Sequence, residues 1–295
     1  MKMLLSEIVG LTAALAMAAS GAGAVFETAQ WIAPPTQTNS GPLPIFRKEF
    51  FVPAQPSNAG LRVIGLGDYD ALLNGRRIAE TGINQPWSQY EKTVYYRDFD
   101  VPALLAPGTN CLGVLLANSF WDNPNPPPGR YSKDGPQRAA DEPFRLCAEL
   151  ILRGSDGALR RIGTDATWRT TAGPVTFSHI YAGEDFDVRR RPLGWERAGF
   201  DDGAWAVGRV LAPPAAGLER QTWPGFKELD RFTPTSIKEP ALGVFRYSFA
   251  QNCSAQLRLE LEGGKPGDRI TFRCASSNAS GWAAWKSAGK PSKPW

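Results

Sequence analysis

The sequence predicts an all-β protein made of many short strands joined by tight turns. Its 295 residues include 30 glycines, 25 prolines and 10 tryptophans, a balance that is typical of turn-rich β domains rather than of helical proteins. The sequence has no long amphipathic stretch with the 3.6-residue period of a helix. This length would hold one large domain or two ordinary ones, and we expect two.

Residues 61–96 contain the clearest strand signal. Asn74-Gly75 lies between two strand-like runs, and this pair predicts a hairpin because a type I′ turn needs positive φ at both central residues. Further along, alternation over 87–96 places Val94 and Tyr96 on the same face of a strand. We therefore expect three strands and two turns, which together form the nucleus of one antiparallel sheet.

Three more runs are typical of strands. Residues 45–52 have apolar ends and a charged middle, and residues 111–117 are apolar throughout, as expected for a strand that is buried on both faces. In 145–153 the even-numbered apolar residues share one face. Between the last two runs, residues 118–143 form a polar, proline-rich loop of a length that is usually functional or disordered.

The N-terminus resembles a secretory signal peptide over residues 1–24. Lys2 precedes an apolar run at 11–19, and Ala22-Gly23-Ala24 has the small-x-small pattern of a cleavage site. No later segment has the length needed to span a membrane. We expect a soluble protein that is secreted or periplasmic, with no membrane partner.

Composition suggests how the rest of the chain is divided. An approach segment at 25–44 leads into a first domain at 45–210, and a Pro/Ala-rich linker follows at 211–216. Residues 217–295 begin a second β domain that is low in large apolar residues after Ser276. We expect this second domain to be incomplete.

The charge pattern argues against a nucleic-acid partner. The net charge of +4 arises from 33 basic and 29 acidic residues that are interspersed along the chain, whereas duplex binding needs a concentrated basic face.

Four cysteines could pair in an oxidising compartment. Cys111 and Cys147 lie in strand-like runs and are either buried thiols or a disulfide, and the spacing of Cys253 and Cys274 suits neighbouring strands with or without a bond. Zinc is not expected, because the sequence has no C-x-x-C and its only histidine is His179. His179 lacks a nucleophile pattern nearby, and we expect it at a strand edge.

Taken together, these segments resemble the N-terminal part of bacterial alpha-L-rhamnosidases of glycoside hydrolase family 78. The pieces that carry the resemblance are, in chain order, FRKEF (46–50), LGDYDALLNGRRI (66–78), PWSQYEKTVYYRDFDV (86–101), NCLGVLLANSFW (110–121), GTDATWRTTAGPV (163–175), GEDFDVR (183–189) and GWERAGFDDGAW (194–205). The later stretch LEGGKPGDRITFRCA is also similar, but Ser276 and Ser277 stand where the family has a glutamate.

The resemblance implies a jelly-roll-like antiparallel β-sandwich over 45–210, of the kind that serves some family members as a rhamnose-binding module. It also implies that hydrolysis occurs in an (α/α)6 barrel with paired acidic residues, for which this chain has no room. We expect an accessory portion of an exported alpha-L-rhamnosidase that is inactive alone and has no catalytic residues of its own. The catalytic domain would be separately encoded or lost. The main alternative is a free-standing, lectin-like rhamnose-binding module.

A rhamnose-containing carbohydrate is the expected ligand, because pyranose faces stack on aromatic rings while polar side chains bind the hydroxyls. The residues that offer this chemistry on or near the long loop are Trp87, Tyr90, Trp121, Asp122, Asn123 and Tyr131. The alternative is that these aromatic residues pack over the sheet and that the loop faces a catalytic domain.

The densest acidic cluster comprises Glu184, Asp185 and Asp187. We expect these residues to cap turns and to pair with Arg189, and calcium binding is the alternative. No other cofactor is expected. An active glycosidase built on this cluster or on Asp201-Asp202 is the least favoured interpretation.

Overall fold

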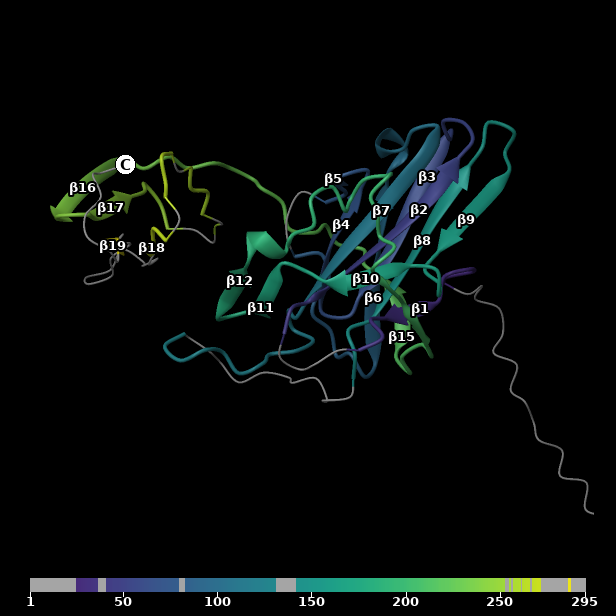
Figure 1. Ribbon diagram of the computed structural model, residues 1–295, viewed down its shortest axis with the longest axis horizontal. Helices are drawn as coiled ribbons and strands as arrows, with labels where there is room; N and C mark the ends of the chain where they lie inside the picture. Colours follow the sequence, from purple (N-terminus) through teal and green to yellow (C-terminus); the bar gives the residue numbers. More distant parts are fainter. Residues whose placement is uncertain are drawn as a thin grey trace, which may run out of the picture. The chain divides into compact units, whose positions relative to one another are not determined.

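The computed structural model describes residues 25–36, 41–79, 83–130, 142–252, 255, 257–260, 262–265, 267–271 and 286–287. The chain divides into two compact units, the first ending at Lys227 and the second beginning at Glu228. Both consist of strands (Figure 1). Helical structure in the described residues is confined to the 3-10 turns η1 (Pro102–Leu104) and η2 (Val188–Arg190), so no helix there could cross a membrane. The predicted all-β fold is confirmed.

The first unit contains one sheet of seven strands. In spatial order these are β14 (Arg209–Leu211), β1 (Trp31–Ala33), β8 (Leu146–Arg153), β3 (Asn58–Gly65), β6 (Thr93–Asp100) and β15 (Gly217–Arg220), with β9 (Leu159–Gly163) also paired to β8. All of these pairs are antiparallel except β15 with β6, which is parallel.

A second sheet of six strands completes the sandwich. Its order is β13 (Ala206–Val207), β10 (Arg169–Ala172), β2 (Pro44–Val52), β7 (Gly108–Ala117), β4 (Asp68–Leu73) and β5 (Arg76–Arg77). Consecutive strands alternate between the sheets: β2, β4, β7 and β10 belong to the second, and β3, β6 and β8 to the first. This alternation makes the sandwich jelly-roll-like, as expected. A separate hairpin joins β11 (Val175–His179) to β12 (Gly183–Phe186).

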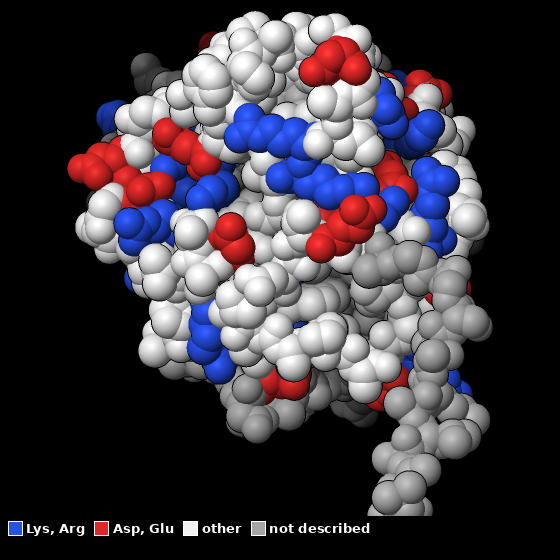
Figure 2. All heavy atoms as spheres, turned by 90° about the vertical axis from the view of Figure 1, so that its right-hand side faces the viewer, with Lys and Arg blue, Asp and Glu red and all other residues white. Residues whose placement is uncertain are grey.

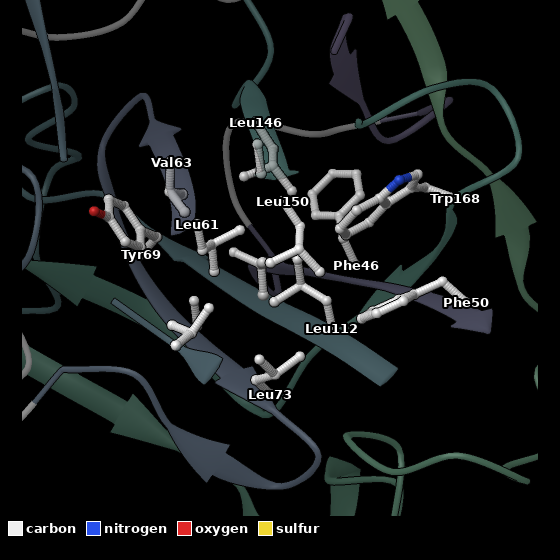
Figure 3. Close-up of a cluster of buried hydrophobic side chains, with 14 of the residues drawn as sticks. Phe46, Phe50, Leu61, Val63, Tyr69, Leu73, Leu112, Leu146, Leu150 and Trp168 are labelled. Atoms are coloured by element: carbon white, nitrogen blue, oxygen red, sulfur yellow. The ribbon is translucent and has the colours of Figure 1, made fainter. Parts of the chain in front are cut away.

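The main core lies between the two sheets. Figure 3 shows side chains from both sheets pointing toward one another, with Trp168 beside Phe46. On β8 the predicted face is confirmed, because its even-numbered apolar residues are all buried in this core. Trp168 is fully buried and its Nε1 donates to the Gly163 carbonyl at 3.0 Å, so this large ring meets the requirement that a buried indole N–H be bonded.

The opposite face of the first sheet carries a smaller apolar cluster, which we call the outer cluster. Its buried members are Trp31, Ile64, Leu66, Tyr90, Val94 and Cys147. Tyr96 packs against it, so the predicted shared face of Val94 and Tyr96 is confirmed. Loops therefore cover this sheet face instead of leaving it open to water.

The Asn74-Gly75 hairpin is confirmed. The two residues have φ of 54° and 78°, as a type I′ turn requires, and they connect β4 to β5.

The expectation that residues 61–96 form part of one sheet is wrong. β3 and β6 belong to the first sheet, whereas β4 and β5 belong to the second. The chain changes sheet at Gly67, whose φ is 107°, and a Cβ atom there would lie 1.9 Å from the carbonyl oxygen of Ala117. Only glycine tolerates this combination of backbone conformation and close approach.

The first unit extends past the segment 211–216 that we expected to be a linker. Strand β15 follows this segment and pairs with β6 from Gly217 opposite Thr93 to Arg220 opposite Tyr96. The hydrogen bonds of β15 thus belong to the sandwich, and the first unit ends at Lys227.

The second unit contains two short antiparallel pairs within its described residues. Strand β16 (Ser236–Ala241) pairs with β17 (Val244–Ser248), and β18 (Ile270–Thr271) pairs with β19 (Lys286–Ser287). Several large apolar side chains of this unit are exposed, among them Leu229 and Leu242.

Candidate functional site

Trp87 is the predicted sugar-binding residue that is most open to solvent. It lies in the loop between β5 and β6 with 66% of its surface exposed, and its ring centroid is 6.2 Å from that of Phe120. An exposed indole beside a second ring offers a flat apolar surface, which is what the face of a pyranose packs against.

Tyr90 and Trp121 lie beneath this surface. Their rings meet edge to face with centroids 5.1 Å apart, and both pack in the outer cluster. Only 9% of Tyr90 is exposed, and burial raises the pKa of its hydroxyl. Neither face of the Tyr90 ring is free for stacking in this conformation, so its part in a site would be to support Trp121.

Asp122 and Asn123 are buried at the start of the long loop, with 5% and 4% of their surfaces exposed. The Asn118 side chain donates to Asp122 Oδ2 at 3.0 Å, and the Asp122 amide donates to the Asn118 carbonyl at 3.3 Å. Ser119, inside this turn, has a φ of 47°. The turn thus places Asp122 and Asn123 next to Trp121. Tyr131 lies outside the described residues.

Four neighbouring side chains in these two segments carry a buried polar atom that has no hydrogen-bond partner among the described residues. The atoms are Tyr90 Oη, Ser119 Oγ, Trp121 Nε1 and Asn123 Oδ1. Leaving a buried donor or acceptor unpaired costs about 1–3 kcal/mol, and such groups in native proteins are normally bonded to protein or to ordered water. A polar ligand or bound water molecules would supply hydrogen-bond partners for this group of unpaired atoms.

A buried carboxylate, which the sequence did not single out, fixes the loop that carries Trp87. Asp68 Oδ1 accepts backbone N–H groups from Tyr69, Asn84 and Gln85 at 2.7–2.9 Å. Burial raises the pKa of Asp68 to about 7 in spite of these three donors. The loop is therefore tied to the start of β4 immediately before Trp87.

His179 is the last residue of β11, as predicted, and is buried. Its Nδ1 accepts the backbone N–H groups of Tyr181 and Ala182 at 3.0 and 3.1 Å, and burial lowers its pKa. Because Nδ1 is occupied by two donors, the ring holds the β11–β12 turn and is not arranged as a general base.

The acidic cluster on and after β12 is engaged by arginines. Asp187 Oδ1 accepts from Arg189 Nε at 2.8 Å, and this hydrogen bond is the main reason that its pKa falls to about 2. Asp185 pairs with Arg130 at 2.5 Å, whereas burial raises the pKa of Glu184. The described residues contain no group of three or more side chains arranged to hold a metal ion.

Two buried charges that looked like ordinary strand residues act as structural anchors. Arg47 on β2 donates to Glu49, to Asp202 and to the carbonyl of Trp195, which fastens the tryptophan-bearing segment 194–205 to the second sheet. Glu149 on β8 is fully buried and forms hydrogen bonds with the segment that precedes β1.

We call residues 25–33 the N-terminal strap. Glu149 Oε1 accepts the amides of Glu27, Thr28 and Ala29 and the Thr28 hydroxyl, and Arg161 donates to Oε2 at 3.0 Å. The hydrogen bonds outweigh burial and lower the pKa of Glu149. The strap is thus held to the first sheet by a charged anchor.

Cys111 and Cys147 are buried free thiols. They lie in different sheets, on β7 and β8, and burial raises the pKa of Cys111 to about 11, so the thiol is in its unreactive protonated form. Cys253 and Cys274 lie outside the described residues.

Comparison with known proteins gives a consistent picture. The family model described as the alpha-L-rhamnosidase N-terminal domain matches residues 54–230. A curated alpha-L-rhamnosidase of Streptomyces avermitilis is 31% identical over 219 residues, which is 74% of this chain and 21% of that protein. Another, from Formosa agariphila, is 28% identical over 230 residues, covering 77% of this chain and 24% of its own length.

Solved structures give the same match. The alpha-L-rhamnosidase of Streptomyces avermitilis, determined in complex with L-rhamnose, superposes with a TM-score of 0.61 at 30% identity, over 70% of this chain and 20% of that one. The alpha-L-rhamnosidase from Dictyoglumus thermophilum gives a TM-score of 0.64 at 28% identity, over 76% and 26%. The chain spans about a fifth to a quarter of the length of these relatives.

Proposed function

Because this chain belongs to the alpha-L-rhamnosidase N-terminal domain family, we propose that it is an accessory β-sandwich of an enzyme that removes terminal alpha-L-rhamnose from glycans or glycosides. The observation that carries the proposal is that the family match, residues 54–230, covers the sandwich from β3 to β15. The catalytic domain would be a further part of the same protein or a separate chain.

We propose that the sandwich does not hydrolyse rhamnosides by itself. An inverting glycosidase needs a general acid with a raised pKa and a general base on opposite sides of the sugar, about 6.5–9.5 Å apart. Asp187, with its pKa near 2, is a poor general acid, and Asp202 is paired with the buried Arg47. One carboxylate of each acidic cluster is thus paired with an arginine, and Glu184, whose pKa burial raises, is the remaining candidate for a general acid.

Incubation of the purified chain with a chromogenic alpha-L-rhamnoside tests this proposal. We expect no turnover above the uncatalysed rate. Turnover that disappears in Glu184→Gln or Asp187→Asn, but persists in the control Asp100→Asn, would instead make the chain an active glycosidase.

A second candidate function, binding of L-rhamnose by the sandwich itself, is favoured by the four unpartnered polar atoms around Trp121. Trp87 contacts Phe120, which lies in the same segment as three of these atoms, and ordered water can connect buried groups to the hydroxyls of a pyranose stacked on Trp87 at little cost. This module would deliver the enzyme to rhamnose-containing carbohydrate, or act as a free-standing lectin-like protein.

Titration of the chain with L-rhamnose, with and without calcium, tests this second candidate. We expect millimolar affinity that is lost in Trp87→Ala and retained in Trp223→Ala, which removes an exposed indole elsewhere in the first unit. An unchanged affinity in Trp87→Ala would mean that the rhamnose site lies elsewhere, and no binding at tens of millimolar sugar would leave the sandwich with a structural role.

Export is also a proposal, supported by the signal-like pattern of residues 1–24. Mass spectrometry of the chain expressed in a Gram-negative host should find a periplasmic product that begins at Val25, and an uncleaved cytoplasmic product would contradict it.

A further inference from the structure

A polar groove lies between strands of different sheets, and none of its lining residues is one of the predicted sugar-binding residues. It has a volume of about 350 Å³, within the range of roughly 300–1,000 Å³ that is typical of small-ligand sites. Its walls come from β2 of the second sheet, β9 of the first sheet, and Thr28 of the N-terminal strap. A smaller hollow of about 240 Å³ continues from it and shares Lys48 and Glu49.

The walls of this groove are held in place before any ligand arrives. Glu149 fixes the backbone of Thr28 and also binds Arg161, so two lining residues share one buried anchor. Gly163 lets the strap approach closely, because a Cβ atom there would lie 2.6 Å from Ala29 Cα. A preformed polar site loses less conformational entropy when a ligand binds.

Two of the cations that line the groove have no carboxylate partner in the part of the chain that the structure describes. Glu49 is paired with Arg47, and Arg161 is paired with Glu149 and Glu27. That leaves the cations Lys48 and Arg160, neither of which has a carboxylate within 4 Å among the described residues, and one carboxylate, Asp165.

Both cations retain unused donors. Lys48 Nζ donates to Thr167 Oγ1, and Arg160 Nη1 donates to the Phe51 carbonyl at 2.5 Å. An ammonium has three N–H donors and a guanidinium five, so both can bind a further acceptor. Strand β9 lies at the right-hand edge of the sandwich in Figure 1, and Figure 2 shows Lys and Arg side chains lying side by side on the face seen from that side.

We propose that this groove binds the carboxylate of a uronate sugar through Lys48 and Arg160. The hydroxyl of Thr28 and the carboxylate of Asp165 line the same groove and supply partners for the sugar hydroxyls. That the ligand is a saccharide rests on the proposed function, whereas that it carries a negative charge rests on the two cations Lys48 and Arg160 alone. The groove and the Trp87 surface consist of different residues. The groove would therefore bind an acidic sugar residue of the polysaccharide whose rhamnose binds at Trp87.

Isothermal titration calorimetry of the full chain with D-glucuronate, D-glucose and inorganic sulfate, at one ionic strength, tests the proposal. We expect glucuronate to bind at least about tenfold more tightly than glucose, because one charge-assisted hydrogen bond contributes a factor of that order. It should also bind more tightly than sulfate, which lacks the hydroxyls that Thr28 and Asp165 would bind. Lys48→Gln and Arg160→Gln should each weaken glucuronate binding about tenfold, and Lys92→Gln, which removes an exposed cation outside the groove, should not.

Several outcomes would overturn the proposal. Absence of glucuronate binding, or binding that is unchanged in Lys48→Gln and Arg160→Gln, would remove the site. Equal affinity for sulfate and glucuronate would leave an anion site and remove the saccharide assignment. Melting temperatures of the variants show whether they fold, and a parallel L-rhamnose titration distinguishes failure of this groove from failure of the Trp87 surface.

Discussion

Replacement of Asp68 by asparagine should change how the stability of the sandwich depends on pH. Asp68 is 5% exposed, and its Oδ1 accepts three backbone N–H groups. Burial disfavours the charged carboxylate while the three donors favour it, and burial prevails, because the pKa rises from 3.8 to about 7. Asparagine keeps an acceptor of the same shape and carries no charge at any pH.

The sign and size of the effect follow from proton binding. Between pH 3.8 and about 7 the folded chain keeps a proton on Asp68 that the unfolded chain has released, so stability falls as the pH rises through this window. The contribution is complete below about pH 4 and is lost above about pH 7. A gap of about three pKa units corresponds to roughly 4 kcal/mol at about 1.4 kcal/mol per unit.

Urea unfolding, followed by tryptophan fluorescence from about pH 4.5 to about pH 8, measures this contribution. The free energy of unfolding of Asp68→Asn, relative to that of the natural chain, should rise by a few kcal/mol across the range. Asp100→Asn, which removes an exposed carboxylate, should give a difference that changes little. A constant difference for Asp68→Asn, or one that falls with pH, would mean that the three N–H donors prevail over burial.

Three further substitutions test other parts of the fold by the same unfolding assay. Glu149→Ala should destabilise the chain by roughly 3–5 kcal/mol, because it leaves the amides of the strap unpaired and removes one of the two carboxylates that bind Arg161. Limited proteolysis should then cut within 25–33, and an uncut strap would contradict this role. Gly67→Ala should cost at least roughly 1–3 kcal/mol in backbone strain alone, whereas Gly60→Ala, with no atom within 4 Å of the new Cβ, should cost less than about 1 kcal/mol. Trp168→Ala should cost roughly 3–5 kcal/mol, whereas Trp87→Ala should stay within about 0.5 kcal/mol; equal effects would contradict the burial of Trp168.

Strands and turns could be predicted where neighbouring residues decide the conformation. The Asn74-Gly75 hairpin depends on two φ angles that these residues adopt readily, and β8 follows from its own alternation. The change of sheet at Gly67 could not be predicted, because its reason is the carbonyl of Ala117, a residue of another strand.

The same distinction applies to the candidate site. Trp87 is exposed as sugar binding requires, but Tyr90 is buried because Trp121, far from it in the sequence, packs against it. The sequence did not single out Arg47, in the charged middle of the run 45–52, or Glu149, between Ala148 and Leu150. Their burial comes from the segment 194–205 and from the N-terminal strap, whose positions only the folded chain fixes.

The N-terminal strap also constrains the order in which the sandwich can fold. Its strand β1 pairs with β14, from Trp31 opposite Leu211, and touches β8 through Ile32 and Leu146. Strand β1 is synthesised early but cannot complete its pairing until β14, nearly the last strand of the sandwich, has been made. Closing so long a loop is slow. Until β14 is synthesised, the edge of β1 that faces it remains unpaired, so a chain interrupted before β14 would leave that edge free to pair with a neighbouring molecule.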